Sequence, residues 1–325
     1  MNHFSTISEA ILDPFLSVLD PEKRVFWPFL VASLVLALWV AVKERRERSL
    51  RSFLTYLFPM KIWLHASALL DYRLLFAKAL LRLVLITPWA MSAFGLSVWW
   101  VGILNKNFGV VSPVSMDKTQ IMVLYTLILF IGWDLSRYVL HRLLHTVPFL
   151  WEFHKVHHSA EVLTPFTLYR SHPVESMLYA LRGVLVVSAI TGTFFYFFKS
   201  QAIQYEVLSV NVLGFFFNFT GGNLRHSHVW LSYGKKFEHI FISPAQHQVH
   251  HSVDEEHFNK NYGTWLSVWD WLSGTLYVTS EKEGLRFGLS EAELNHDPHR
   301  VGSILVFPLW AGIKRLWPQK LPVKR

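Results

Sequence analysis

The chain has 325 residues, of which 52% are apolar, 16% aromatic and only 17% charged, whereas an ordinary soluble domain has roughly 25% charged residues. With a mean hydropathy of +0.28 and with 14 Trp and 26 Phe, it is predicted to be an integral membrane protein, in which aromatic residues gather at the interfaces. The lack of cysteine excludes disulfides, iron–sulfur clusters and thiolate zinc sites. The net charge is +8, and many basic residues lie beside apolar runs, which favours contact with anionic lipid over binding of nucleic acid.

The first predicted membrane span covers residues 25–42, which are 18 uncharged residues. The residues before it lack the basic region, short apolar core and cleavage site of a signal peptide, so we expect no cleaved signal. Residues 43–51 follow with seven charges, five of them basic. By the positive-inside rule this flank is cytoplasmic.

Four further apolar stretches follow in the sequence. Residues 77–104 are long enough to cross and should be kinked at Pro88, and residues 120–140 return the chain to the cytoplasmic side. Residues 183–198 and 203–220 predict either a crossing hairpin or a re-entrant pair, so the chain leaves and re-enters on one side. Amphipathic residues 49–73 and the proline-broken residues 304–317 are expected to lie in the interface. We therefore predict an all-α polytopic fold with about four to five transmembrane helices and a cytoplasmic helical cap.

Histidines gather where the third predicted span ends. His141 and His145 are four residues apart, which places both rings on one helix face. Asp134 lies two turns earlier on the same stripe. A carboxylate within the membrane is costly and usually has a partner, so we expect Asp134 to accept a ring N–H of a ligand histidine.

The sequence H-x-V-H-H-S occurs twice, and each copy places three imidazoles at i, i+3 and i+4 on one helical face. Together with the first pair, these triplets give eight candidate metal ligands: His141, His145, His154, His157, His158, His247, His250 and His251. One zinc ion needs about four ligands, so eight imidazoles favour two metal ions. Imidazole suits zinc, iron, copper or nickel, and the absence of H-E-x-x-H argues against a metalloprotease.

A second pair of histidines, His226 and His228, lies where the last apolar stretch ends. Gly221 and Gly222 would let the backbone turn the following segment towards the site. Residues two apart point to nearly opposite sides of a helix, so only one of the pair is expected to face the metals. We predict that His226 is a ninth ligand and that His228 supports it or contacts substrate.

Three more polar residues are candidates for ligands or for groups that hold the ligands. His172, in "RSHPVE", either binds metal or pairs with Glu175. Asn261 and Asp270 lie in the Trp-rich "NYGTWLSVWDWLSGT" and either brace the site or pack the loop.

These motifs resemble the fatty acid hydroxylase superfamily, also called sterol desaturase-like. Its signature is H-x(3,4)-H followed by two copies of H-x(2,3)-H-H, which here corresponds to the eight histidines above. The flanking "LWEFHKVHHS", "RSHPVE" and "SPAQHQVHHS" are similar to the sterol desaturase branch, and the spacing of the first five histidines is also similar to alkylglycerol monooxygenases. The resemblance covers residues 133–279, while the first hundred residues match only in being apolar.

The resemblance implies a non-haem di-iron centre that activates O₂ and oxidises a C–H bond of a lipid taken from the bilayer. Hydroxylation, desaturation, demethylation and ether cleavage all occur in the family, so the reaction stays open. The family often has an extra ligand before the last motif, which supports His226. No G-x-G-x-x-G and no H-P-G-G haem motif occurs, so we expect an external electron donor of cytochrome b5, ferredoxin or pterin type. An active site facing the cytoplasm, in the endoplasmic reticulum or a bacterial inner membrane, is expected.

The predicted organisation has three parts. Residues 1–118 form N-terminal membrane and interfacial helices, residues 119–280 the catalytic domain, and residues 281–325 a C-terminal interfacial tail. Two other functions stay open from the sequence. A histidine-relay metal transporter would bury its ligands at mid-membrane in broken helices, and a metal-dependent lipid hydrolase would need one zinc ion and an acid–base glutamate.

Overall fold

The computed structural model describes residues 7–45, 49–81, 93–199, 206–207, 210–279, 281–290, 293 and 297–316. It is helical, as expected, with a single pair of two-residue antiparallel strands among the described residues. In chain order the elements are α1 (Ile7–Leu16), η1 (Ser17–Leu19), α2 (Trp27–Arg45), α3 (Leu50–Leu57), α4 (Met60–Trp63), α5 (Ala66–Leu81), α6 (Ala93–Phe108), α7 (Lys118–Thr146), α8 (Pro148–His158), η4 (Pro165–Tyr169), α9 (Pro173–Phe198), β1 (Glu206–Val207), β2 (Val210–Asn211), α10 (Val212–Phe219), η6 (Gly222–Arg225), η7 (Phe237–His239), α11 (Pro244–His250), η8 (Glu255–His257), α12 (Val268–Ser273) and α13 (Val301–Leu316).

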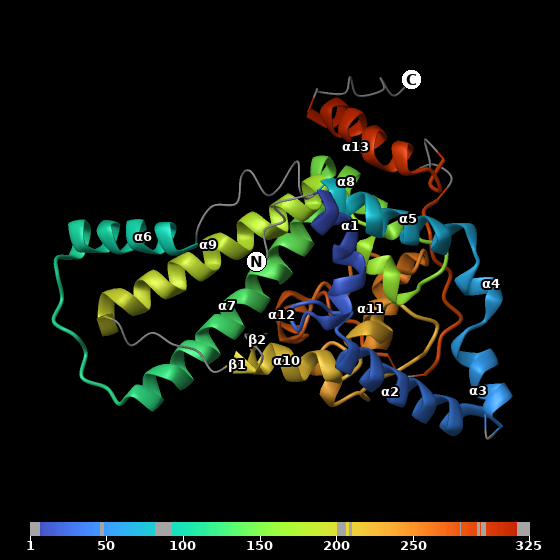
Figure 1. The fold of residues 1–325 in the computed structure, drawn as a ribbon, viewed down its shortest axis with the longest axis horizontal. Coiled ribbons are helices and arrows are strands. Elements are labelled where there is room, and N and C mark those ends of the chain that lie inside the picture. The colour runs from blue at the N-terminus through green and yellow to red at the C-terminus, as the bar shows by residue number, and fades with distance from the viewer. Residues whose placement is uncertain are drawn as a thin grey trace.

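Two long helices, α7 and α9, extend away from the rest of the molecule, and α6 lies alongside α9 (Figure 1). A capping box at Asp117 starts α7, which then runs for 29 residues. Close approach of α6 and α9 depends on a missing side chain, because a Cβ at Gly192 would lie 2.8 Å from the carbonyl oxygen of Ser97. Helices without an intervening side chain pack closely in lipid.

Three of the described helices, α2, α7 and α9, are long and apolar enough to cross a membrane. A fourth crossing results if the bent unit of residues 50–81, in which α3–α4 and α5 meet at 82°, is counted as one span. The sequence placed residues 49–73 in the interface, and this bend is compatible with either arrangement. The expected span over residues 77–104 includes residues 82–92, with Pro88, which lie outside the described part of the chain.

Residues 203–220, expected to be half of a crossing hairpin or of a re-entrant pair, do not form a spanning helix in their described part. The β1–β2 pair and α10, a helix of only 8 residues, occupy this stretch. Eight helical residues extend about 12 Å, far less than the roughly 30 Å of a bilayer core. Since α10 packs against α2 and α7, the apolar residues of this stretch are used to cover neighbouring helices.

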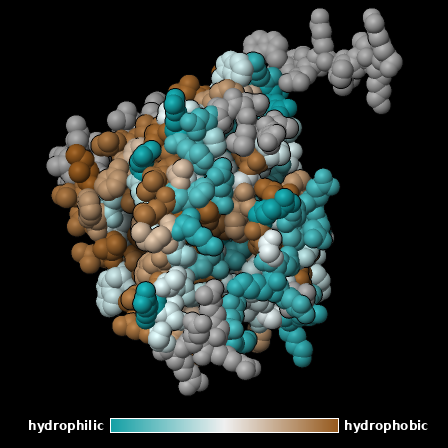
Figure 2. All heavy atoms as spheres, turned by 90° about the vertical axis from the view of Figure 1, so that its right-hand side faces the viewer, coloured by the Kyte–Doolittle hydropathy of each residue, from teal (hydrophilic) through white to brown (hydrophobic). Residues whose placement is uncertain are grey.

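The short helices gather at the end of α7 where α8 begins, and α13 packs across α8 (Figure 1). A buried ion pair joins this region to α5: Arg170 Nε lies 2.6 Å from Asp71 Oδ1, and both side chains are fully buried. Arg170 also donates to the carbonyl oxygens of Ser67 and Ser159. On the face seen in Figure 2, hydrophobic side chains gather on one side and hydrophilic ones on the other, as expected for a protein that meets both lipid and water.

Candidate metal centre

All nine histidines predicted as ligands converge in the structure. They form two neighbouring groups, within each of which the nearest ring nitrogens lie within 4.8 Å of one another. The first group contains His141, His145, His154, His158 and His250, and the second contains His157, His226, His247 and His251.

Local structure explains how three helices deliver these rings. In α7, His141 and His145 are one turn apart and share a face. A sharp turn at Val147, followed by Pro148 at the first position of α8, directs α8 back across the end of α7. Ser243 caps α11 through a capping box with Gln246, which fixes the start of the third histidine helix.

Each histidine triplet contributes to both groups. In the first triplet, His154 and His158 join the first group while His157 joins the second. In the other triplet, His250 joins the first group while the residues on either side of it in the pattern, His247 and His251, join the second. The two helices therefore cross-link the groups, and neither group can form without both.

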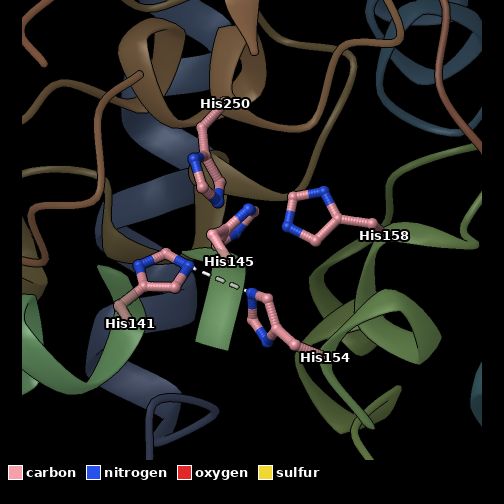
Figure 3. A group of neighbouring side chains, drawn as sticks. All are labelled: His141, His145, His154, His158 and His250. Atoms are coloured by element: carbon pink, nitrogen blue, oxygen red, sulfur yellow. Dashed lines mark hydrogen bonds between the residues drawn. The ribbon is translucent and has the colours of Figure 1, made fainter. Parts of the chain in front are cut away.

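The first group surrounds a common centre, towards which its rings point (Figure 3). His141 Nε2 and His154 Nε2 are 3.1 Å apart. The Nε2 atoms of His145, His158 and His250 are buried and have no hydrogen-bond partner among the described residues. Five imidazole nitrogens are thus close enough together to bind one metal ion.

In the second group, His226 is central. Its Nε2 lies 3.1 Å from that of His247, 3.2 Å from that of His251 and 3.3 Å from that of His157. Gly221, at φ = +101°, adopts the left-handed conformation that turns the chain into η6 and on to His226. The predicted glycine turn and the predicted placement of His226 are both found.

Groups behind the rings fix their orientation. His141, His157 and His250 each donate their Nδ1–H to a backbone carbonyl, those of Tyr262 (2.8 Å), Arg170 (3.1 Å) and Lys260 (2.7 Å) respectively. His154 Nδ1 lies 3.1 Å from Glu175 Oε1. A donating Nδ1–H leaves Nε2 as a free electron pair directed inwards, which is the tautomer that binds a metal.

The donor set and its spacing fit metal ions. The facing Nε2 atoms of His141 and His154 both carry lone pairs, which repel one another at 3.1 Å unless a cation lies between them. Two nitrogens bound to one ion at about 2.0–2.1 Å would be about 3.0–3.4 Å apart. The observed separations of 3.1–3.3 Å fall within that range.

Electrostatics keep the rings in the neutral form that a metal requires. Burial, helped by the neighbouring His154, lowers the pKa of His157 to about 3, and burial likewise lowers the pKa of His250 to about 3. Burial also lowers the pKa of the other four rings that lie outside the membrane-capable helices and show a shift: His158, His226, His247 and His251. At neutral pH these six imidazoles are therefore uncharged ligands rather than cations.

Five further residues predicted as possible ligands or supports lie outside both groups: His172, His228, Asp134, Asn261 and Asp270. His172 caps α9, accepting the N–H of Val174, and its Nε2 contacts the carbonyl oxygen of Leu305. It belongs to neither histidine group, and no hydrogen bond or ion pair joins it to Glu175 within the described residues. The glutamate instead faces His154.

Asp134 does not accept a histidine N–H, contrary to the expectation from its helical stripe. Its two oxygens accept the backbone N–H groups of Trp265 and Leu266 and the indole N–H of Trp269. Asp134 therefore holds the Trp-rich loop against α7 and does not contact the histidine groups directly.

Asn261 and Asp270 brace the same loop. Asn261, at φ = +57°, donates to the carbonyl oxygen of Gln246 in α11 and accepts from the N–H of Tyr277. Asp270 accepts from the N–H groups of Tyr262 and Gly263. The carbonyl oxygen of Tyr262 accepts the hydrogen bond from His141 Nδ1. Asp270, which holds the Tyr262 backbone, therefore also helps to position a ring of the first group.

Sequence reasoning missed the groups behind the rings. The carbonyls of Arg170, Lys260 and Tyr262 carry no signature, because any residue type supplies a carbonyl. The contact of Glu175 with His154 joins residues from different helices. A signal existed for the buried Arg170, since it is the first residue of the "RSHPVE" segment quoted for the family resemblance.

Two cavities flank the centre. An apolar cavity of ≈ 380 Å³ lies among α2, α5, η4 and residues 223–229, and His228 is in its wall. A more polar cavity of ≈ 490 Å³ is lined by four of the ligand candidates, His145, His158, His250 and His251. His228 Nε2 lies 2.6 Å from the carbonyl oxygen of Tyr56. It faces away from the ring of His226, as the spacing of two predicted, although this segment is not helical.

Fold and site together define a helical protein with membrane-capable helices and two adjacent histidine groups suited to metal ions. Residues 126–275 match the family model described as fatty acid hydroxylase. The chain is 28% identical to alkylglycerol monooxygenase of Homo sapiens over 56% of its own length and 36% of the relative's. It is 29% identical to ornithine lipid hydroxylase of Rhizobium tropici over 48% and 43%, and 27% identical to Delta(7)-sterol 5(6)-desaturase of Saccharomyces cerevisiae over 59% and 44%.

The match to the fatty acid hydroxylase model covers just under half of the chain, and these relatives are named a monooxygenase, a hydroxylase and a desaturase, which agrees with the resemblance expected from the sequence. Its matched part spans less than half the length of each of these three relatives. No solved structure matches the chain.

Proposed function

We propose that this protein is a membrane-bound non-haem oxygenase that uses O₂ to hydroxylate or desaturate a lipid, with two iron ions held by the nine histidines. The observation that carries the proposal is the pair of imidazole groups, five rings beside four, inside the segment that matches fatty acid hydroxylase. When bound, the ions would supply the O₂ activation needed to oxidise a C–H bond, which side chains cannot provide.

Each part of the chain then has a defined task. The first group would hold one ion and the second group the other. Backbone carbonyls of Tyr262, Arg170 and Lys260 orient the rings through Nδ1, and Glu175 holds His154. Most of the rings are buried, so the protein limits contact of the centre with water to the side of the polar cavity, which suits a reactive oxidant.

The two cavities suit different partners. The apolar cavity fits a lipid chain, because its lining is almost entirely hydrophobic and lies beside the membrane-capable helix α2. The polar cavity gives four ligand rings access to the surface and suits an external electron donor, of cytochrome b5, ferredoxin or pterin type. The relatives' printed names include a monooxygenase, a hydroxylase and a desaturase, so we leave the choice of reaction to experiment.

We further propose that the histidine groups face the cytoplasm, in the endoplasmic reticulum or a bacterial inner membrane, and that residues 119–280 form the catalytic domain. Five basic residues after the first span support the orientation. The C-terminal end of α7 adjoins α8, and α9 begins at Pro173 on the same, histidine-bearing side of the molecule. Both helices would therefore leave the membrane on that side.

Neither alternative function is favoured. A hydrolase with a single zinc ion would leave one of the two histidine groups without a task. A transporter relay would place the rings near the middle of the spans, whereas seven of the nine lie outside α2, α7 and α9.

Metal analysis of the purified chain tests the proposal, combined with a comparison of lipids from cells that lack or overproduce the protein. Two iron ions per chain and an O₂-dependent change in one lipid class are expected. One zinc ion per chain with no O₂-dependent product would favour the hydrolase and overturn the oxygenase.

A further inference from the structure

Four arginines, one of which directly precedes His226 of the second histidine group, form no ion pair with an acidic side chain among the described residues. Arg24 precedes α2, Arg137 lies in α7, Arg182 lies in α9 and Arg225 directly precedes His226. We call these four residues the arginine cluster. They come from segments distant in sequence, so only the fold brings them together.

Contacts from the described residues trace the cluster. Arg182 donates to the carbonyl of Trp133 and to Ser136, the residue next to Arg137. Arg137 donates to Thr264 (3.3 Å) and its guanidinium lies 4.9 Å from the ring of Tyr179.

The other two arginines complete the cluster. Arg225 lies 5.5 Å from the ring of Phe217, and that ring in turn packs at 6.2 Å from Trp265, the neighbour of Thr264. Asn223 donates to the backbone carbonyl of Arg24 and so fixes that residue beside η6.

The charges of the cluster are not neutralised by protein groups. Asp134 lies three residues before Arg137 in α7, but its oxygens accept from the loop at Trp265, Leu266 and Trp269. No ion pair joins any of the four arginines to an acidic group within the described residues.

Arg225 is the most deeply buried of the four arginines. It is 3% exposed, and its Nε has no hydrogen-bond partner among the described residues. An arginine keeps its proton in proteins, so the buried Arg225 guanidinium stays charged at a cost to stability.

The position of the cluster relative to the membrane limits what can neutralise it. At 1.5 Å per residue, the 29 residues of α7 extend about 43 Å, so about nine residues exceed the roughly 30 Å bilayer core. Arg137 lies nine residues before the end of α7 and Arg182 is the tenth residue of α9. With the bilayer core over the ends of α7 and α9 remote from the histidines, both arginines lie at the depth at which lipid headgroups meet the hydrocarbon.

We propose that the arginine cluster binds the oxyanion, a phosphate or a carboxylate, of a lipid headgroup beside the second histidine group. Guanidinium groups bind such oxyanions through paired charge-assisted hydrogen bonds. Leu224 and Asn223, adjacent to Arg225, line the apolar cavity, so one amphiphile has both its chain and its headgroup accommodated. The identification of this amphiphile as the substrate rests on the proposed function, whereas the binding of the oxyanion does not.

The test is lipid binding by the purified full chain, with its metal content recorded. Thermal unfolding is measured in nanodiscs of phosphatidylcholine with and without phosphatidylglycerol, and in phosphatidylcholine with inorganic phosphate added. The variants are Arg137→Gln, Arg225→Gln and the conservative Arg225→Lys. Arg300→Gln is the matched control, because Arg300 is 80% exposed and pairs with Asp297.

Phosphatidylglycerol is expected to raise the Tm of the wild type, Arg225→Lys and Arg300→Gln. The rise should be lost in Arg225→Gln and Arg137→Gln, with a loss of apparent affinity of about tenfold or more for each removed guanidinium. Without anionic lipid, Arg225→Gln should be at least as stable as the wild type, because an uncompensated buried charge has been removed. An arginine with a merely structural role would instead lower Tm in every lipid.

The remaining outcomes are also decisive. An equal Tm rise with inorganic phosphate alone would keep the oxyanion site but overturn the lipid as its source. A Tm rise that Arg225→Gln and Arg137→Gln share with the wild type would overturn the site. Loss of binding without any O₂-dependent turnover in the wild type would support this site while refuting the oxygenase, so the two proposals fail separately.

Discussion

Individual side chains in the metal centre differ in task although they share a residue type. His226 and His228 are two residues apart, yet one touches three other imidazoles and the other lies in the wall of an apolar cavity, near the carbonyl of Tyr56. The backbone bends at residues 226–228, directly after η6, and so directs the two rings to different partners.

The first prediction concerns this pair. His226→Ala removes the ring that lies within 3.3 Å of three others, so it should lose about one of two metal ions and abolish turnover. His228→Asn should retain both ions. Metal analysis by mass spectrometry decides, and metal loss in His228→Asn with normal content in His226→Ala would reverse the assignment.

A second prediction addresses the carboxylate behind His154. Glu175→Gln keeps the shape but removes the charge that faces His154 Nδ1 at 3.1 Å. Metal affinity should fall about 10–100-fold, the usual cost of losing a partner behind a ligand histidine. Competition with a chelator of known affinity measures the change, with the exposed Glu281→Gln as control. Equal affinity in both variants would show that Glu175 does not position the ring.

At the scale of secondary-structure elements, the site depends on where helices stop and how closely they pack. The turn at Val147 directs α8 across the end of α7, and the capping box at Ser243 fixes α11. Further away, α6 and α9 touch through Gly192, whose hydrogen takes the place of a side chain. Such contacts determine how rigidly α9 presents Glu175 and Arg182.

The third prediction compares two glycines of this helix pair. In Gly192→Ala, the new Cβ would lie 2.8 Å from the Ser97 carbonyl oxygen and 2.9 Å from Trp100 Cδ1, so the helices must separate at a cost of about 1–3 kcal/mol. Gly102→Ala, in α6, meets nothing within 4 Å and should be neutral or slightly stabilising. Unfolding in mixed detergent micelles gives both values. A Gly192→Ala variant as stable as Gly102→Ala would contradict the close packing.

For the whole molecule, the central question is which face meets the cytosol. The histidine groups lie at one end of α7, while the loop before Asp117 lies at the other, about 43 Å away. A bilayer around α7 and α9 therefore separates residues near His158 from residues near Ser115.

The fourth prediction uses the absence of cysteine in the chain. Ser115→Cys and Glu161→Cys introduce single thiols at exposed positions on either side. In intact cells, an impermeant maleimide should label Ser115→Cys, whereas Glu161→Cys should react only after the membrane is opened. The opposite pattern would place the histidine groups outside the cytoplasm.

The sequence alone determined the chemistry of this protein. Helical spacing identified eight of the nine histidines that converge, because i, i+3 and i+4 repeats place rings on one face of a helix, and the glycine turn together with the family resemblance indicated His226. Hydropathy identified the apolar cores of α2, α7 and α9, because a long and predominantly apolar run is typical of a membrane span. The position of Gly221 also indicated the turn that leads to His226.

Only the tertiary structure decided how those rings divide and what stands behind them. Each triplet is shared between two groups, because α8 and α11 face one another across the end of α7. Asp134 holds a distant loop and His172 caps a helix, although periodicity and proximity in sequence suggested contact with the histidines. Backbone carbonyls and the arginine cluster depend on segments far apart in the chain, and local patterns carry no information about which segments meet.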